Sequence, residues 1–528
     1  QQLLECGFEK YAENVDGIGG TVFSATFKKD ELVLTVAYYA MESNTSISFY
    51  TGALSDHLVY QDSYLKGNQK NAKTKLHMVE LWRFGNSFIF QLKNGHFVIS
   101  DGGTYVDLPY LLDYLEELTP KGEKPHIEAW VISHSHGDHC GALIALSEHT
   151  DWIERIYVDG VYFSEPSEKI ADACGGDMEN AQIKWVTRML QASNGERTKF
   201  YRPQTGQRYY FNDITMDILI CQEHVPFEDY HDDLNTSSTV CVFEVEGQKI
   251  CLSGDIHQEG MQFIVNNYTK EYLTLDFFSL NHHGFNTSTV FTDYSTIKTV
   301  FVTTKDVLPI TALRETKALL NKSEESVQWG DGTSIFTFPY TVGSYELLPK
   351  REWIYNKEDV RGPQPSLYVF CHVNFKVFIF DADTILFDGE QLKNDIKECL
   401  DYLLDKTIRM SVYSATMDTE SLVKQLKDNE IDGYFEVIIG AEQLSQEKPC
   451  VDALHKTEAA MKVEQIHKYV FVSNQVDVVR EIVLEGARTL VITEGKDVCE
   501  EIEYKAWKKF KTFDELYNYF ETRDVIFE

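Results

Sequence analysis

Three histidines and an aspartate crowd into six positions directly after an apolar segment, and this feature constrains the chain most strongly. The stretch reads Val131-Ile-Ser-His134-Ser-His136-Gly-Asp138-His139. Its apolar residues predict a strand, and the polar residues predict a loop at the strand's end. Imidazole nitrogens and carboxylate oxygens are good ligands for zinc and other borderline divalent ions. Four ligand-type residues at this density therefore predict a metal site.

The length of the chain predicts several domains. At 528 residues, and with roughly 150 residues per domain, three or four domains are expected. We predict an α/β protein with a β-rich extension at residues 1–80, an α/β domain at 81–348, a polar linker at 349–373 and a doubly wound parallel sheet at 374–528. The extension shows no catalytic cluster, which favours an edge-strand or dimerisation module.

The histidine-rich stretch resembles the HxHxDH signature of the metallo-β-lactamase superfamily, whose domains are αββα sandwiches. Two later stretches continue the resemblance: Cys251-Leu-Ser-Gly254-Asp255 resembles a strand that ends in a bridging aspartate, and Asn281-His282-His283-Gly284 resembles a late histidine. The resemblance implies a pair of Zn²⁺ or similar divalent ions. It assigns His134 and His136 to the first metal, Asp138, His139 and His283 to the second, and Asp255 to both.

Two ligand positions stay open on the sequence alone. His282 is the rival of His283, which is preferred because it directly precedes a glycine. The remaining histidine of the first metal must come from His149, His224 or His231. Among these, His224 fits best because it follows a strand-like segment. Asp101 is expected to hold a loop by hydrogen bonds rather than to bind metal.

The resemblance implies a dinuclear metal-dependent hydrolase that uses a metal-bound hydroxide, with Asp138 and Asp255 as catalytic residues. The segment Asn235-Thr-Ser-Ser-Thr-Val-Cys-Val-Phe resembles the branch containing phosphorylcholine esterases and the hydrolase domain of bacterial DNA-uptake proteins. A phosphodiester is therefore the leading substrate, with a lactone, thioester or β-lactam as the alternative. A second alternative is a non-catalytic, metal-bearing binding or regulatory protein. His136 stands where diiron reductases of the superfamily carry glutamate, which argues against that chemistry.

The last domain resembles the haloacid dehalogenase superfamily, because Phe380-Asp381-Ala-Asp383 places two carboxylates directly after an apolar strand. The resemblance implies Asp381 as nucleophile, Asp383 as general acid, Ser414 and Lys448 as phosphate ligands, and Asp477 as an Mg²⁺ ligand. Two departures favour a degenerate phosphatase-like domain. Ile385 replaces the usual threonine, and Val472-Ser473-Asn474 stands where a glycine-aspartate pair is expected.

Charge and cysteine usage indicate the partners and the location. The formal net charge of -34 repels polyanions and anionic lipid headgroups, so we expect a small-molecule substrate, no duplex nucleic acid, no membrane and a homodimer as an open option. Ten cysteines without a CxxC pair favour a reducing cytoplasm. The chain opens at Gln1 rather than Met, which leaves a removed signal peptide open.

Overall fold

The computed structural model falls into two compact units, which we describe separately. The first comprises Gln1–Ile170 and Ile183–Val360, and the second Ala171–Gln182 and Arg361–Glu528. The description omits residues 1, 63–68, 83–84, 149, 167–176, 225–233, 286, 304–313, 329–331, 352–375, 464–467, 486, 497–498, 500–501, 503–505, 507 and 523–528. Most of the expected linker at 349–373 lies outside the described residues.

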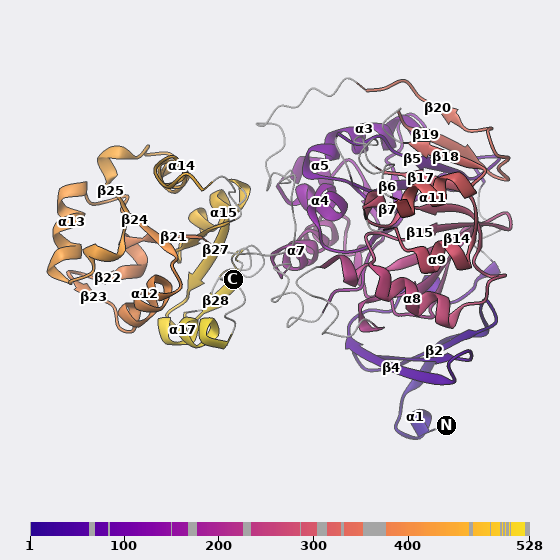
Figure 1. The fold of residues 1–528 in the computed structure, drawn as a ribbon, viewed down its shortest axis with the longest axis horizontal. Helices are drawn as coiled ribbons and strands as arrows, with labels where there is room; N and C mark the ends of the chain where they lie inside the picture. The colour runs from indigo at the N-terminus through magenta and orange to yellow at the C-terminus, as the bar shows by residue number, and fades with distance from the viewer. Residues whose placement is uncertain are drawn as a thin grey trace. The chain divides into compact units, whose positions relative to one another are not determined.

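The first unit begins with a four-stranded antiparallel sheet. The strands follow each other in chain order: β1 (Glu9–Ile18), β2 (Val22–Lys29), β3 (Leu32–Tyr39) and β4 (Asn44–Thr51). The short helix α1 (Gln2–Glu5) precedes them. The four strands agree with the β-rich N-terminal extension that the sequence predicted. This sheet lies at the edge of the first unit (Figure 1).

Two larger sheets form the body of the first unit. The first has the order β11-β10-β8-β7-β6-β5-β19-β20, with β9 beside β8, and the second runs from β12 through β13, β14, β15, β16 and β17 to β18. The strands of the first sheet are β5 (Lys75–Met78), β6 (Ser87–Gln91), β7 (Phe97–Asp101), β8 (His126–Ile132), β9 (Tyr157–Val158), β10 (Gly160–Phe163), β11 (Lys199–Tyr201), β19 (Ser334–Thr337) and β20 (Glu346–Leu347). Those of the second are β12 (Arg208–Phe211), β13 (Ile214–Ile220), β14 (Val240–Val245), β15 (Gln248–Leu252), β16 (Thr274–Ser279), β17 (Thr296–Val302) and β18 (Glu325–Gln328).

The two sheets pack face to face through aromatic side chains. Phe90 of one sheet stacks at 4.5 Å, centroid to centroid, on Phe243 of the other, and Phe88 lies 5.4 Å from Phe301. These rings belong to one continuous buried cluster. Because strands buried on both faces must be apolar throughout, segments such as Phe97-Val-Ile-Ser are strand-like without alternation.

Helices accompany these sheets and complete the αββα sandwich that the sequence predicted (Figure 1). They are α3 (Leu108–Leu118), α4 (Gly137–Ala145), α5 (Thr150–Ile153), α7 (Asp177–Ser193), α8 (Gln258–Asn267), α9 (Thr289–Tyr294) and α11 (Arg314–Lys322). Leu111, Leu112 and Leu115 of α3 show why such a helix attaches: they repeat at helical spacing and are fully buried in the common core.

The second unit is a parallel sheet with helices, as the repeated strand-helix pattern predicted. Its strand order is β25-β24-β21-β26-β27-β28. The elements are β21 (Val377–Asp381), β22 (Phe387–Asp388), β23 (Gln391–Leu392), α12 (Ile396–Asp405), β24 (Arg409–Tyr413), α13 (Thr419–Asp428), β25 (Val437–Ile439), α14 (Pro449–Met461), β26 (Tyr469–Val472), α15 (Val476–Glu485), β27 (Arg488–Ile492), β28 (Lys508–Phe510) and α17 (Phe513–Thr522). Strand β21 lies inside the sheet, so Asp381 at its end is buried.

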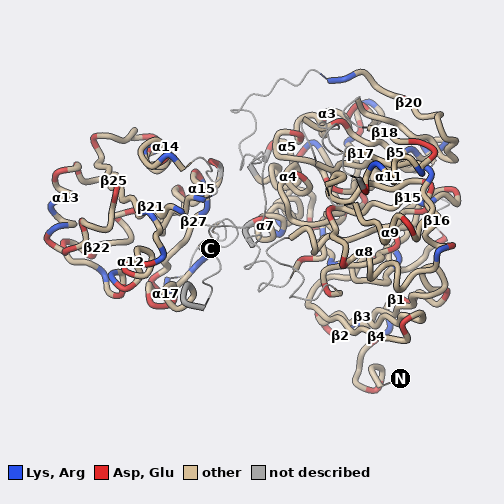
Figure 2. Tube along the Cα trace, viewed as in Figure 1, with Lys and Arg blue, Asp and Glu red and all other residues tan. Residues whose placement is uncertain are grey.

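Charged residues of both signs are interspersed over both units (Figure 2). Among the described residues, none of the helices has the length and apolar character needed to span a membrane.

Candidate metal centre

The histidines and aspartates of the first unit gather because each follows the end of a parallel strand. β7 and β8 are parallel neighbours, as are β15, β16 and β17. The carboxyl ends of parallel strands meet at one edge of a sheet, which is where such folds place their ligands. His134 and His136 follow β8, Asp255 follows β15, and His283 follows β16.

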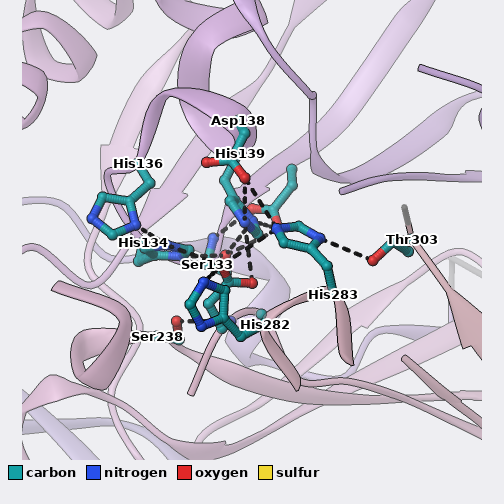
Figure 3. Close-up of polar contacts among 12 residues, drawn as sticks. Ser133, His134, His136, Asp138, His139, Ser238, His282, His283 and Thr303 are labelled. Carbon is teal, nitrogen blue, oxygen red and sulfur yellow. Dashed lines mark hydrogen bonds and ion pairs between the residues drawn. The ribbon is translucent and has the colours of Figure 1, made fainter. Parts of the chain in front are cut away.

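The structure brings six of the predicted metal ligands into two adjoining groups (Figure 3). In one group, potential ligand atoms of four residues lie within 4.8 Å of one another: Asp138, His139, Asp255 and His283. In the other, the same holds for His134, His136 and Asp255. Asp255 belongs to both groups, which is the position that the sequence assigned to a bridging carboxylate.

The four-residue group is tightly packed. His283 Nε2 lies 3.0 Å from Asp138 Oδ2 and 3.4 Å from Asp255 Oδ2. His139 Nε2 lies 3.2 Å from Asp255 Oδ1 and 3.6 Å from Asp138 Oδ2. All four side chains are buried. Imidazole nitrogens and carboxylate oxygens are donors that zinc accepts.

The three-residue group has two imidazoles and the shared carboxylate. His134 Nε2 lies 2.9 Å from His136 Nδ1 and 3.9 Å from Asp255 Oδ2. Among the described residues, no third histidine joins this group. Within that part of the chain, the first metal position therefore has three potential protein ligands and the second has four.

The structure corrects the expectation for His224, which joins neither group. Its Nε2 lies 2.6 Å from the Tyr39 hydroxyl, and its ring stacks on Phe263 with the centroids 4.8 Å apart. The physical reason is that the turn after β13 carries this ring toward the N-terminal sheet. The other two candidates, His149 and His231, lie outside the described residues.

His282 and His283 differ in whether they join a ligand group. Both adopt left-handed φ angles, 47° and 54°, a conformation that costs a residue other than glycine about 1 kcal/mol or more. His283 enters the four-residue group, whereas His282 belongs to neither group. Gly254 is left-handed as well, and a Cβ there would lie only 2.8 Å from Ser133 Cβ. These three left-handed residues all lie at the candidate metal centre.

Residues behind the ligands fix which imidazole nitrogen faces the centre. His139 Nδ1 lies 2.8 Å from Asp101 Oδ2, and His283 Nδ1 lies 3.0 Å from Thr303 Oγ1. Asp101 also accepts hydrogen bonds from the backbone N–H and hydroxyl of Ser133. These contacts hold the Nε2 atoms toward the carboxylates. The predicted hydrogen-bonding role of Asp101 agrees with them. The sequence pattern does not identify Ser133 and Thr303 as site residues, although each is a polar residue directly after an apolar strand.

Burial and charge set the protonation of the centre. Burial alone would lower the pKa of His139, but neighbouring carboxylates, Asp255 first, hold that pKa well above its ordinary value. The pKa of His283 is raised to about 9 in the same way, against the effect of burial. Burial and two nearby imidazoles instead hold the pKa of His134 well below its ordinary value. His134 is thus neutral, the form of histidine that binds metal.

Two buried polar atoms that lack a hydrogen-bond partner indicate whether a metal would fit these residues. Among the described residues, His139 Nε2 and Asp255 Oδ1 are buried without a hydrogen bond of ordinary geometry, although they lie 3.2 Å apart. Buried polar atoms nearly always have a partner. A divalent cation that accepts both lone pairs would satisfy them, and nitrogen and oxygen donors suit zinc or a similar ion. The residues therefore fit a divalent metal centre.

We predict that Asp101→Asn lowers metal affinity by about 10- to 100-fold, the usual effect of losing a residue that orients a ligand. Asparagine keeps the shape of the side chain but lacks its negative charge. Whether its oxygen or its amide group faces His139 Nδ1, the carboxylate that orients this imidazole is lost. Competition with a chromophoric chelator measures the affinity. Asp113→Asn is the control, because its side chain is 59% exposed on α3 and pairs with Arg155; an equal loss there, or none at Asp101, would contradict the prediction.

The second unit assembles only part of its expected site. Asp381 accepts hydrogen bonds from Ser473 and Thr384, and burial raises its pKa. Asp383 accepts hydrogen bonds from Ser414 Oγ at 2.5 Å, from Thr416 Oγ1 and from the backbone N–H of Ala415, both at 2.6 Å. The carboxylate of the expected general acid thus binds Ser414, one of the two residues expected to bind phosphate.

The remaining predicted residues of the second unit have other partners. Lys448 Nζ lies 2.5 Å from a carboxylate oxygen of Glu481. Asp477 pairs with Arg480 one turn along α15, and its side chain is 85% exposed. Within the described part of the chain, Asp477 and Asp381 join no group of potential metal ligands. The structure therefore does not bring Asp477 to the place expected of an Mg²⁺ ligand.

Comparison with protein families agrees with both units. Residues 81–292 match the model described as "Metallo-beta-lactamase superfamily", and residues 364–473 match "Haloacid dehalogenase-like hydrolase". The chain therefore contains a metallo-β-lactamase superfamily domain followed by a haloacid dehalogenase-like domain. Both belong to superfamilies of hydrolases.

Individual relatives cover parts of the chain. ComE operon protein 3 of Bacillus subtilis (strain 168) is 25% identical over 172 residues, which are 33% of this chain and 19% of that protein. The match thus spans about a fifth of the relative's length. A haloacid dehalogenase-like family hydrolase from Streptococcus pneumoniae is 16% identical with a TM-score of 0.23, covering 28% of this chain and 99% of that one. A HAD-superfamily hydrolase from Ehrlichia chaffeensis is 19% identical with a TM-score of 0.22, covering 26% and 65%.

Proposed function

We propose that the first unit hydrolyses small phosphodiesters with the help of two divalent metal ions. The observation that carries the proposal is the shared carboxylate of Asp255, which belongs to both ligand groups and so favours two neighbouring ions. Two such ions, when bound, supply an activated water and stabilise the attacking and leaving oxygens of a phosphoryl displacement.

The chain's own residues would position the reactants. His134, His136, His139, His283, Asp138 and Asp255 would hold the ions. Asp138 lies in the first turn of α4, and its Oδ2 lies 3.0 Å from His283 Nε2. Its Oδ1 is the atom that would accept a proton and orient the attacking water. The formal net charge of -34 opposes long polyanions, which favours a small diester over a nucleic acid.

We propose that the second unit has lost phosphatase activity. The support is the carboxylate of Asp383, which accepts a hydrogen bond from Ser414, the hydroxyl expected to hold a phosphate. A phosphate entering there would meet a carboxylate at close range, and like charges repel strongly in a partly buried site. Lys448, the expected balancing charge, pairs with Glu481.

A substrate panel with metal analysis tests both proposals. The full chain should contain about two divalent ions and cleave bis(p-nitrophenyl) phosphate, and a chelator should abolish the activity. Asp138→Asn should lower the rate by about 100-fold or more, the scale of a lost general base. Asp381→Asn is the matched carboxylate control in the second unit and should leave the rate unchanged.

The other outcomes separate the alternatives. Cleavage of a lactone, thioester or cephalosporin, with the diester untouched, would replace the phosphodiester assignment. Full metal content without turnover of any panel member would favour the non-catalytic alternative. Release of inorganic phosphate that disappears in Asp381→Asn would overturn the proposal that the second unit is inactive.

A further inference from the structure

The N-terminal sheet packs one of its faces against the rest of the first unit, partly through hydrogen bonds. Ser24 Oγ donates to the Gly206 carbonyl at 2.6 Å, and the Gln207 side chain donates to the hydroxyls of Thr26 and Thr35 at 3.0 and 3.2 Å. These residues of β2 and β3 are buried. Since side chains alternate across a strand, the intervening residues must lie on the opposite face, away from the body of the unit.

That opposite face, which we call the outer face, is mainly apolar over β2, β3 and β4, whereas β1 at its edge places Lys10 and Glu13 beside Phe27 and Ala25. Its side chains come from three strands in register: Phe23, Ala25, Phe27, Leu34, Val36, Tyr38, Ile47 and Phe49. The exposed fraction is 73% for Phe49, 62% for Ile47 and 42% for Tyr38. In an ordinary antiparallel sheet the apolar face packs inward and the polar face meets water. Here the inward face buries Val22, Val33, Ala37 and Tyr39 beside its polar residues, and the outer face is largely apolar as well, so we expect it to be covered.

The size of the outer face suits the centre of a protein interface. Three strands about 4.8 Å apart and eight residues long span roughly 400 Å² of sheet plane. Contiguous apolar patches on monomers rarely exceed a few hundred Å² unless they bind something. A standard interface buries roughly 800 Å² per partner, so this patch would supply the central part of one.

Charge favours a second copy of this chain as the partner. Neither β3 nor β4 contains a charged residue, and the trace of β3 carries no charge colour in Figure 2. A chain with a formal net charge of -34 repels its own copies except through a neutral surface. An anionic lipid surface is disfavoured by the same charge, and a cationic partner would find no carboxylate on these two strands.

The differing sizes of the side chains on the outer face also suit self-association. The row Ala25, Val36, Ile47 lies between two rows with larger side chains, one of which is Phe27, Leu34, Phe49. In a two-fold symmetric dimer the same patch serves both partners. The row with larger side chains of each copy can then pack against the row with smaller side chains of the other. Two twisted sheets pack this way about 10 Å apart.

We propose that the chain forms a homodimer in which the outer faces of two N-terminal sheets pack against each other. Light scattering after size exclusion should give twice the chain mass of 60.8 kDa. Phe49→Glu places two like charges in the interface and should weaken dimerisation at least 100-fold by sedimentation equilibrium. Phe49→Ser should weaken it less. Both changes are on a 73% exposed side chain, so circular dichroism should stay unchanged.

Leu404→Glu is the matched control, since this leucine is 52% exposed in the second unit, and it should remain a dimer. A wild-type chain that stays monomeric up to about 100 µM would overturn the proposal. So would a Phe49→Glu variant that dimerises like wild type, which would place the interface elsewhere. Binding of a monomeric wild-type chain to phosphatidylcholine vesicles, lost in Phe49→Glu, would assign the face to a lipid surface instead.

Discussion

Asp255→Ala is expected to remove both metal ions together and to lower hydrolysis by roughly a thousandfold or more, because metal ions supply several kcal/mol of transition-state stabilisation. Asp255 is the only residue common to the two ligand groups that the described part of the chain contains. Its Oδ1 lies 3.2 Å from His139 Nε2, and its Oδ2 lies 3.4 Å from His283 Nε2. Losing this carboxylate leaves each group one anionic ligand short.

Elemental analysis of the purified variant, alongside a diester assay, measures this effect. His134→Ala offers an informative comparison, because His134 belongs only to the three-residue group; this variant should keep about one ion. Asp293→Ala is a control for the loss of a carboxylate, since its side chain is 69% exposed on α9, and it should keep both ions. An Asp255→Ala protein with full metal content would refute the bridging role.

The second large effect is on stability: Trp130→Ala should destabilise the first unit by about 3 to 5 kcal/mol, the usual cost of deleting a buried tryptophan. Trp130 is fully buried in β8, between Ile99 of β7 and Val161 of β10. Its Nε1 donates to the Asp101 carbonyl at 3.2 Å. The substitution therefore leaves a cavity under the residue that orients His139.

Urea unfolding followed by far-ultraviolet circular dichroism measures this change, with chelator present so that metal binding does not add to the stability. Trp130→Phe should lose less, because it keeps most of the ring volume. Leu347→Ala tests an exposed position of the same unit, 46% accessible on β20, and should change the unfolding free energy by less than about 1 kcal/mol. A comparable loss in Leu347→Ala, or none in Trp130→Ala, would contradict the packing argument.

Much of the metal centre was predictable because its residues follow apolar strands. His134, Asp255 and His283 each come after such a segment, and parallel strands bring those points to one edge of a sheet. Local sequence fixes the strands, and the fold class fixes where their ends meet. The two strands β2 and β3 and the parallel sheet of the second unit were predictable for the same reason.

Other residues could not be assigned in this way, because their roles depend on partners far along the chain. His224 follows a strand as the sequence required, yet its imidazole bonds to Tyr39, 185 positions away. Lys448 and Asp477 stand at the positions that the family pattern predicts, but Glu481 and Arg480 pair with them. No local sequence pattern predicts these contacts.

The sequence by itself determined the chemistry available to this protein: histidines and carboxylates after buried strands, and an apolar alternation in the N-terminal sheet. Only the tertiary structure decided which of those groups meet. It brought His283 but not His282 into a ligand group, and it left Ile47 and Phe49 of the N-terminal sheet exposed. The reason is that periodicity marks which residues share a face, whereas the direction of that face depends on what the rest of the chain packs against it.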